Sequence, residues 1–227
     1  MSNLFLNADC MDPEVGLPSL PSDSVDIMPV DPPYGIDFQS AWRTESQRFK
    51  KIANDKTPFT VWLKEAYRVL KPGGRLFIFY RWDVAKAFQD AAQEAGFTVV
   101  YEMVWDKGNH GLGDLKACPA PKHEMFLYCT KGRYEFEGKR PTSIIKAMRV
   151  SGPEMIHPNE KPELLYKALY RSFSAGVPVV VDPFAGSAAS LRAAESMGFN
   201  YVGYELDPDY YAAAQARMAK GIQMQLL

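Results

Sequence analysis

Residues 24–38 read SVDIMPVDPPYGIDF, an apolar stretch that runs into four residues able to bind a planar amine: Asp31, Pro32, Pro33 and Tyr34. Prolines lack N–H groups and fix φ, so the carbonyls around Asp31 and Pro32 are held rigidly. A carboxylate and a nearby carbonyl offer two hydrogen-bond acceptors, and the tyrosine ring offers a flat surface beside them. This combination suits an –NH2 group on a heteroaromatic ring, which it would orient toward an electrophile. A tight turn without chemistry is the alternative that the residues leave open.

A second apolar stretch, VVVDPFAGSAASLRAAE at residues 179–195, reaches Asp182 and then a glycine-containing turn before helical sequence begins. Backbone N–H groups at the start of such a helix are suited to bind a ligand. The next apolar stretch ends at Glu205, about twenty residues after the turn, where dinucleotide-binding folds place an acid on ribose hydroxyls. Of the three-glycine fingerprint only Gly186 is present. A nucleoside-type ligand and plain strand–turn–helix packing therefore both stay open.

The elements that must position these residues alternate along the chain. Apolar runs predict strands at 4–6, 25–30, 75–80, 98–105, 124–129, 177–181 and 201–205. Amphipathic patterns predict helices at 60–70, 84–95, 162–173, 187–197 and 208–220. Seven strands separated mostly by helices indicate an α/β fold with an open, mostly parallel sheet covered on both faces. Such sheets bind ligands at the carboxyl ends of their strands, which would bring both turns to one edge.

The charge of the chain is unevenly distributed. A net charge of -1 argues at first against a nucleic-acid partner. However, residues 1–37 contain seven acids and no Lys or Arg, so the remaining 190 residues carry a net charge of +6. Bases gather at 39–56 and at 131–149, the latter with six bases against two acids. Each stretch is either a solvated loop or part of a basic surface for phosphates.

Other features of the composition exclude several classes of protein. The three cysteines are too few and too scattered for a disulfide framework, and no Cys/His spacing suggests a zinc site. No stretch approaches the roughly 18 apolar residues of a membrane span, and the first residues lack the pattern of a signal peptide. Neither a repeat nor a Gly/Ser linker divides the chain. We therefore expect one cytoplasmic domain over residues 1–227, without a membrane or a metal partner.

Together, these stretches resemble the amino-methylating DNA methyltransferases, which use S-adenosylmethionine, in the permuted order called the β class. That order places the catalytic tetrad first, a target-recognition segment in the middle and the cofactor loop last. The matching blocks are NADC at 7–10, DPPYG at 31–35, EAYRVLKPGGRLFIF at 65–79, EMFLYCTKG at 124–132, HPNEKP at 157–162, DPFAGS at 182–187 and GYELDPDYY at 203–211. The resemblance covers nearly the whole chain. It implies a Rossmann-like class I methyltransferase fold with a small target-recognition insertion at 131–156.

The resemblance also implies a reaction. The enzyme would flip adenine out of double-stranded DNA, and its N6 amino group would take the methyl group of S-adenosylmethionine by direct in-line attack. Asp31 and Pro32 would accept the amino hydrogens, with Pro33 completing the tetrad, and Tyr34 would stack on the base. The residues implied for the cofactor are Asp9, His157, Lys161, Asp182, Phe184, Gly186, Ser187 and Glu205. Those expected to contact DNA are Arg43, Arg48, Lys50, Lys51, Lys139 and Arg140.

The chain departs from the family pattern in the cofactor loop. Family members often read Gly-Ser-Gly-Thr where this chain has Gly186-Ser187-Ala188-Ala189, and Ser190 could supply the missing hydroxyl. Two alternatives follow: a cytosine-N4 methyltransferase, because the chemistry is the same, and a catalytically weak DNA-binding subunit that retains the cofactor. Asp31 favours adenine, because Ser is common at that position in the cytosine enzymes. The short recognition segment further suggests a homodimer, and the family suggests a cognate restriction nuclease.

Overall fold

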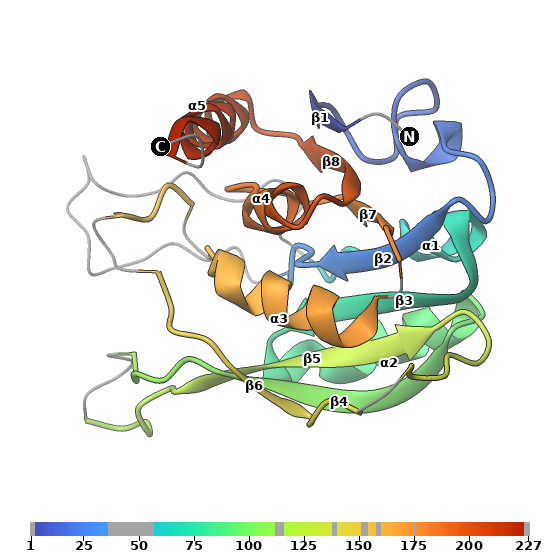
Figure 1. Ribbon diagram of the computed structural model, residues 1–227. Coiled ribbons are helices and arrows are strands. Elements are labelled where there is room, and N and C mark those ends of the chain that lie inside the picture. The colour runs from blue at the N-terminus through green and yellow to red at the C-terminus, as the bar shows by residue number, and fades with distance from the viewer. Residues whose placement is uncertain are drawn as a thin grey trace.

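The computed structural model describes residues 3–35, 57–111, 116–137, 140–150, 154–157, 160–174 and 176–224. Within these residues the chain forms one eight-stranded sheet in the order β1-β8-β7-β2-β3-β5-β4-β6 (Figure 1). The strands are β1 (Leu4–Asn7), β2 (Val25–Val30), β3 (Leu70–Tyr80), β4 (Thr98–Asp106), β5 (His123–Thr130), β6 (Ile144–Lys146), β7 (Val179–Asp182) and β8 (Asn200–Glu205). The sheet is mostly parallel, because among the described strands β5 alone runs against its neighbours. The expected fold class is therefore confirmed.

The sheet has one strand more than the sequence predicts. β6 contains three residues and forms the edge of the sheet beside β4, so that Trp105 lies opposite Ile145. It belongs to the segment 131–156, which the resemblance identifies as the target-recognition insertion. A three-residue edge strand with one buried side chain is too short to produce a detectable period of two.

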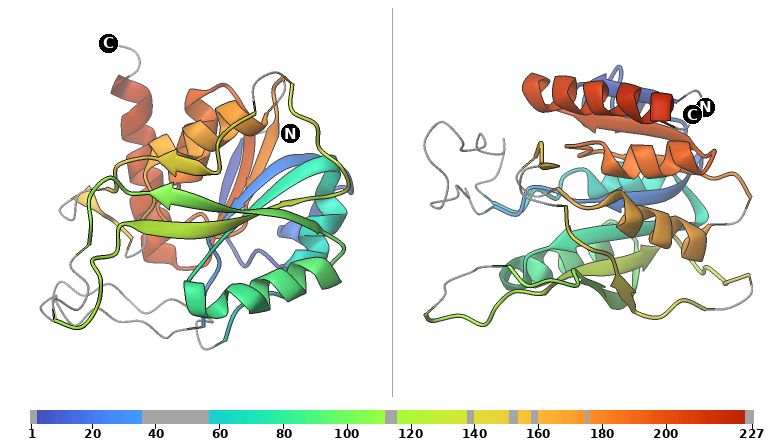
Figure 2. Two further views of the ribbon diagram at one scale, coloured as in Figure 1. Left: turned by 90° about the horizontal axis from the view of Figure 1, so that it is seen from below. Right: turned by 60° about the vertical axis from the view of Figure 1, so that its left-hand side comes forward.

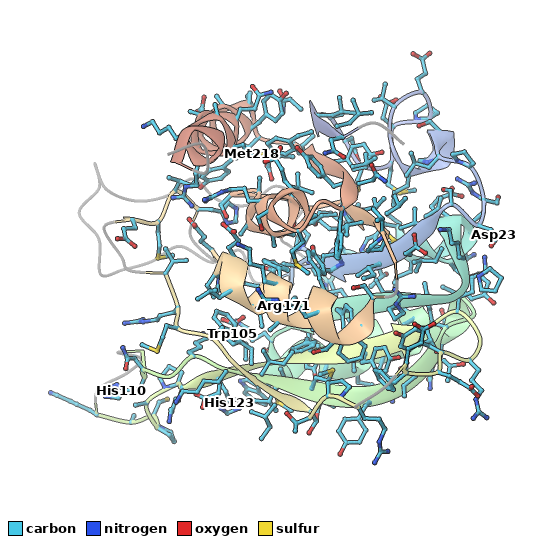
Figure 3. All side chains as sticks on the ribbon, in the orientation of Figure 1. Asp23, Trp105, His110, His123, Arg171 and Met218 are labelled. Atoms are coloured by element: carbon cyan, nitrogen blue, oxygen red, sulfur yellow. The ribbon has the colours of Figure 1, made fainter. Side chains whose placement is uncertain are left out.

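Five α-helices of the described residues cover the two faces of the sheet (Figure 2). One face carries α3 (Glu163–Phe173), α4 (Ala189–Ser196) and α5 (Pro208–Met224), and the other carries α1 (Leu63–Val69) and α2 (Ala85–Glu94). Each layer buries an apolar cluster against the sheet, and side chains fill both spaces (Figure 3). No helix among the described residues is long and apolar enough to cross a membrane.

The central strand β3 is the longest strand among the described residues, and its last seven residues are buried. The sequence predicts a strand at 75–80, but the strand begins at Leu70, directly after α1 ends. Phe77 lies at its centre and is fully buried, with its ring stacked on that of Tyr128 at 5.5 Å between centroids. The ring of Phe173, at the end of α3, meets Phe77 edge-on at 5.0 Å. This aromatic contact joins β3 and β5 to the helix layer and fixes the strand beside β2.

Candidate active site

The carboxyl ends of four neighbouring strands form the edge at which both unusual turns lie. β1, β8, β7 and β2 follow one another in the sheet and run in the same direction. Asn7 lies opposite Glu205, and Asp182 lies opposite Gly203, so the ends of these strands are level. Asp31 and Asp182 each stand at the end of a strand, and the two strands pair through Ile27 and Val180. The tetrad and the glycine turn are therefore neighbours, as the sequence predicts.

The tetrad is held by contacts with the segment that leads into α1. The Pro33 carbonyl accepts a hydrogen bond from the Phe59 N–H at 3.2 Å. Gly35 follows with φ +81, and a Cβ at this position would lie 2.5 Å from the Thr57 Cα. Glycine is needed here for both its positive φ and its lack of a side chain. The Tyr34 ring meets Phe88 of α2 edge-on at 6.5 Å, and its hydroxyl donates a hydrogen bond to the Asp31 carboxylate.

Lys161 connects the tetrad to two other elements. Its ammonium group forms an ion pair with Asp31 and lies 3.6 Å from the Glu124 carboxylate, while only 2% of its side chain is exposed. Glu124 is the second residue of β5, is partly buried and also binds the Lys107 ammonium at 2.6 Å. Burial works to raise the pKa of the Glu124 carboxyl, but the cations of Lys161 and Lys107 outweigh it and lower that pKa. Burial raises the pKa of Asp31, and although the Lys161 cation works to lower this pKa, the Glu124 charge works to raise it.

The turn after β7 folds around the Asp182 carboxylate. Asp182 is 2% exposed and accepts hydrogen bonds from the Ser190 hydroxyl and, at 3.0 Å, from the Phe184 N–H. The Ser190 hydroxyl donates its hydrogen bond to Asp182, and its role in place of the missing hydroxyl of the cofactor loop stays a prediction. The Phe184 ring meets Trp62 edge-on at 5.8 Å, which holds the turn against the opposite face of the sheet. Burial raises the pKa of Asp182 to about 7.

Glu205 links this turn to the end of β8. Its carboxylate accepts the Gly186 N–H at 2.9 Å and the Asp207 N–H at 2.8 Å, one on each oxygen. Each oxygen keeps a lone pair for a further donor. Gly186 has φ +51, and a Cβ there would lie 3.5 Å from the His157 ring. Asp9 follows β1 at the same edge, where it is exposed and accepts the Met11 N–H at 2.9 Å.

Comparison with known proteins identifies the chain. The sequence profile of a family of DNA methylases that act at N6 or N4 positions matches residues 25–216. The chain belongs to the N6/N4 DNA methylases. YubD of Escherichia coli (strain K12), which is named as a methylase, is 33% identical over 219 residues, covering 95% of this chain and 89% of YubD.

Two solved structures share the fold of this DNA methylase. The M1.HpyAVI–SAM complex superposes with a TM-score of 0.71 at 21% identity, over 94% of this chain and 98% of that chain. The PvuII DNA methyltransferase, which is cytosine-N4-specific, gives a TM-score of 0.72 at 16% identity, over 98% and 91% of the two chains. At these identities the likeness establishes the fold only. The Rossmann-like class I architecture expected from the sequence is thus confirmed.

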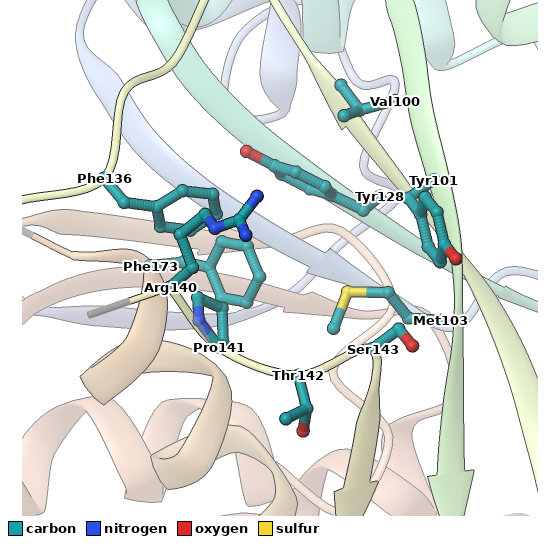
Figure 4. Close-up of a pocket in the computed structure, with 10 residues that line it drawn as sticks. All are labelled: Val100, Tyr101, Met103, Tyr128, Phe136, Arg140, Pro141, Thr142, Ser143 and Phe173. Carbon is teal, nitrogen blue, oxygen red and sulfur yellow. The ribbon is translucent and has the colours of Figure 1, made fainter.

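The structure brings most of the expected site residues of the methylase to one edge, but it separates others from them. Ser187 is 5% exposed in the turn after Gly186, and the half-buried His157 packs edge-on against Tyr210 at 4.7 Å. Arg140 is exposed and lines a cavity of about 660 Å³ on the opposite half of the sheet, together with Phe173 (Figure 4). Five expected DNA contacts lie outside the described residues: Arg43, Arg48, Lys50, Lys51 and Lys139.

Glu124 and Lys107 were missed by the sequence reasoning. Glu124 opens the block EMFLYCTKG but was given no role in the site, and Lys107 lies outside the quoted blocks; they lie 93 and 76 residues after Asp31 in the sequence. The available signal was a charged residue immediately before the run MFLYC, where a carboxylate must find a cation if it is buried. Lys161 was expected to help bind the cofactor. That role stays a prediction, and its ammonium group contacts Asp31 and Glu124 in this structure.

Asp182 makes the stability of the methylase depend on pH. Its pKa is about 7 in the folded protein, against about 3.9 in an unfolded chain. Between these values the folded protein keeps a proton that the unfolded chain releases, so rising pH favours unfolding. We expect the free energy of unfolding of Asp182→Asn, minus that of the wild type, to increase from about pH 4 to about pH 7 and then to level off.

Urea unfolding of both proteins at a series of pH values measures this difference. His157 acts in the opposite direction, because burial lowers its pKa to about 4 and the unfolded chain therefore binds the extra proton. The subtraction removes this contribution, since both proteins retain His157. A difference between the two proteins that is independent of pH would show that Asp182 is ionised in the folded state throughout.

Proposed function

We propose that the chain transfers a methyl group from S-adenosylmethionine to the N6 amino group of adenine in double-stranded DNA. The observation that carries the proposal is the position of an intact tetrad beside the Asp182 turn, at the ends of two paired strands. Membership of the N6/N4 DNA methylases supports methylation of DNA. The choice of adenine rests on Asp31, since the family resemblance associates an aspartate at this position with adenine.

S-adenosylmethionine is the cofactor of this family, and the residues at the ends of β7 and β8 fit it. Gly186 leaves open the space that a Cβ would fill toward His157, and the Glu205 oxygens have lone pairs for ribose hydroxyls. Phe184 and Ser187 would line the same pocket, with Asp182 toward the methionine end and Asp9 toward the adenine. When bound, the cofactor supplies an electrophilic methyl group on a sulfonium sulfur.

The tetrad would orient the amine of the flipped base. Asp31 and the Pro32 carbonyl accept its two hydrogens, which directs the nitrogen lone pair away from the protein and toward the methyl donor. Tyr34, whose hydroxyl donates a hydrogen bond to the Asp31 carboxylate in the free protein, would stack on the base. The Asp31 carboxylate also stabilises the positive charge that develops on nitrogen. No covalent bond to the enzyme would form: the C–N bond forms as the S–C bond of the methyl donor breaks, which leaves a neutral thioether, and the methylated amine then releases one proton to water.

Single-molecule sequencing tests this function directly. The chain is expressed in a methylation-deficient host, and the modified bases of the host genome are read together with their sequence context. We expect N6-methyladenine in one short motif, and unmodified DNA in cells that carry Asp31→Ala. N4-methylcytosine would instead assign the chain to the specificity named for the PvuII enzyme, and unmodified DNA with the wild-type chain would support a silent DNA-binding subunit.

Binding to DNA is expected to weaken steeply as salt is raised. Bases that neutralise phosphates release counterions, so the logarithm of the association constant falls by about 0.9 for each phosphate contact per tenfold rise in salt. The predicted contacts in 39–56 and at Lys139 and Arg140 suggest a slope of roughly −4 or steeper for B-DNA. Fluorescence anisotropy with a labelled duplex from about 50 to 300 mM salt measures the slope. A flat dependence would exclude these residues as phosphate contacts.

The partners of the enzyme follow from the size of its recognition segment. Residues 131–156 leave little chain for reading a long DNA sequence, so we propose that two subunits share recognition in a homodimer. A cognate restriction nuclease is the further partner that we propose, from the family resemblance alone.

A further inference from the structure

Four charged side chains of alternating sign form a row of ion pairs that begins at Asp31 of the tetrad. Asp31 contacts Lys161, Lys161 contacts Glu124 at 3.6 Å, and Glu124 contacts Lys107 at 2.6 Å. Asp31 follows β2, and Lys161 lies two residues before α3. Glu124 lies at the start of β5, and Lys107 follows β4. Trp105 and His123 mark this end of β4 and β5 in Figure 3. The exposed fraction of the side chain is 17% for Asp31 and 2% for Lys161. It is 33% for Glu124 and 19% for Lys107.

Lys161 is the most buried member and is shared by two carboxylates. Its ammonium group also lies 4.5 Å from the centre of the Phe79 ring, which provides a further favourable contact for a cation. Burial works to lower the pKa of Lys161, but Asp31 and Glu124 outweigh it and raise that pKa, so Lys161 stays charged. One carboxylate would be enough to neutralise this charge. A second carboxylate therefore has a different effect: it divides the attraction of Lys161 between two partners.

We propose that Glu124 is a positioning residue, which acts through Lys161 to set how tightly the Asp31 carboxylate is held and thus how readily it binds the target amine. The inference rests on the proposed function, because the amine must compete with Lys161 and Tyr34 for the carboxylate oxygens. Lys107 holds Glu124 in place from β4. On this proposal Glu124 acts through Lys161, so a change of Glu124 would alter the reaction without any contact of its own with the target amine.

The charges around Asp31 predict the direction of each effect. Removing the Lys161 cation raises the pKa of the Asp31 carboxyl, and removing the Glu124 anion lowers it. Activity requires Asp31 in its ionised form, so the acid limb of the pH profile of kcat should follow this pKa. The groups that face Asp31 from the surrounding elements are Tyr34, Lys161, Glu124, Tyr166 of α3 and Asp182 of β7.

The experiment compares Lys161→Met and Glu124→Gln with the full-length wild type. The rate constant kcat is measured from pH 5 to 9 with saturating DNA and S-adenosylmethionine, and dissociation constants for both are measured separately. We expect the acid limb to move to higher pH in Lys161→Met and to lower pH in Glu124→Gln. At neutral pH we expect kcat to fall about tenfold or more in Lys161→Met and severalfold in Glu124→Gln. The dissociation constant for DNA should stay within about threefold of the wild type in both variants, and that for S-adenosylmethionine should do so in Glu124→Gln.

Two controls separate positioning from folding. Glu102→Gln removes a carboxylate from β4 that binds the Tyr80 hydroxyl, and it should leave the acid limb unchanged. Lys161→Arg retains the cation and should restore the wild-type limb, and together with Glu124→Gln it decides the question if Lys161→Met does not fold. The proposal would be overturned if the acid limb moved in the same direction in Lys161→Met and Glu124→Gln, or if it did not move in Glu124→Gln.

A measurement without turnover distinguishes this inference from the proposed function. In the free protein, the carboxyl carbon of Asp31 is followed by NMR during a pH titration, with Asp31→Asn used to assign the signal. Glu124→Gln should shift the midpoint to lower pH whichever base is methylated, and even if the wild type methylates nothing. An unchanged midpoint in Glu124→Gln would remove the electrostatic link and with it the proposal, whereas absent methyl transfer with a shifted midpoint would reject only the proposed function.

Discussion

Replacing Asp31 with Ala is expected to lower kcat for methyl transfer at least about 100-fold, which corresponds to roughly 3 kcal/mol of activation free energy. The substitution removes one of the two acceptors that orient the amine. It also removes the negative charge beside a nitrogen that becomes positive during transfer. Both contributions act at the reacting atom, so DNA binding should change much less than kcat. Transfer of a labelled methyl group, measured beside duplex binding, gives the two quantities.

The ion pair with Lys161 complicates the result and requires controls. Asp31→Ala leaves a buried ammonium group with Glu124 as its remaining carboxylate, and breaking a buried pair costs about 3–5 kcal/mol when the charge is left uncompensated. Thermal unfolding of the variant must therefore be measured before its rate is interpreted. Asp31→Asn preserves the shape and one acceptor without the charge, and should lie between Ala and the wild type in kcat. Asp90→Ala removes an exposed carboxylate that binds Lys86, and should change neither quantity.

Near-normal turnover by a folded Asp31→Ala protein would contradict the assignment of the tetrad. The carboxylate would then serve only to neutralise Lys161, and another group would have to orient the amine. A variant that is inactive only because it fails to bind DNA would place Asp31 in recognition instead. The comparison of Asp31→Ala with Asp31→Asn separates these cases. A large loss of kcat in both variants is expected only if the charge of Asp31 acts on the amine nitrogen.

The sequence predicts the sheet well where strands are buried on both faces. The strand expected at 25–30 has the same bounds as β2, and the helix expected at 162–173 differs from α3 by one residue. Continuous apolar runs and clear helical periods produce this agreement. β3 was predicted five residues too short at its start, because Lys71-Pro72-Gly73-Gly74 indicates a turn. Backbone pairing of Val25 with Leu70 places Leu70 in the strand nevertheless.

The sequence predicts the site residues that stand directly after a strand. It does not predict the contacts between segments that are far apart in the chain. Asp31 and Asp182 could be placed together because parallel strands end at one edge. The ion pairs of Lys161 could not, since sequence spacing does not reveal which carboxylate a lysine reaches. The turn after β7 contains a feature that the sequence does not reveal. Ala188 adopts φ +58, a conformation that L-residues other than Asn and Asp rarely use. The sequence identified Ala188 as a departure from glycine but not its backbone strain.

Replacing Phe77 with Ala is expected to destabilise the fold by about 3–5 kcal/mol, the largest effect that we predict on stability. The ring is fully buried and contacts three other aromatic rings, with centroids at 5.5 Å for Tyr128, 5.0 Å for Phe173 and 6.2 Å for Phe126. The loss contains the transfer free energy of the ring, the cavity that remains and the lost ring contacts. For a chain of this size the midpoint of thermal unfolding should fall by roughly 10 °C.

Two variants of the same protein test whether the cavity causes this loss. Phe77→Leu fills most of the space and should lose much less stability than Ala, because the residual cavity is smaller. Trp82→Ala removes a larger side chain that is 80% exposed, and should change the free energy of unfolding by less than about 0.5 kcal/mol. Equal losses for Leu and Ala at position 77 would assign the effect to the aromatic contacts rather than to the cavity. A loss below about 1 kcal/mol for Ala would mean that β3 and α3 can close around the vacant site, so that this cluster does not fix β3 beside the tetrad strand.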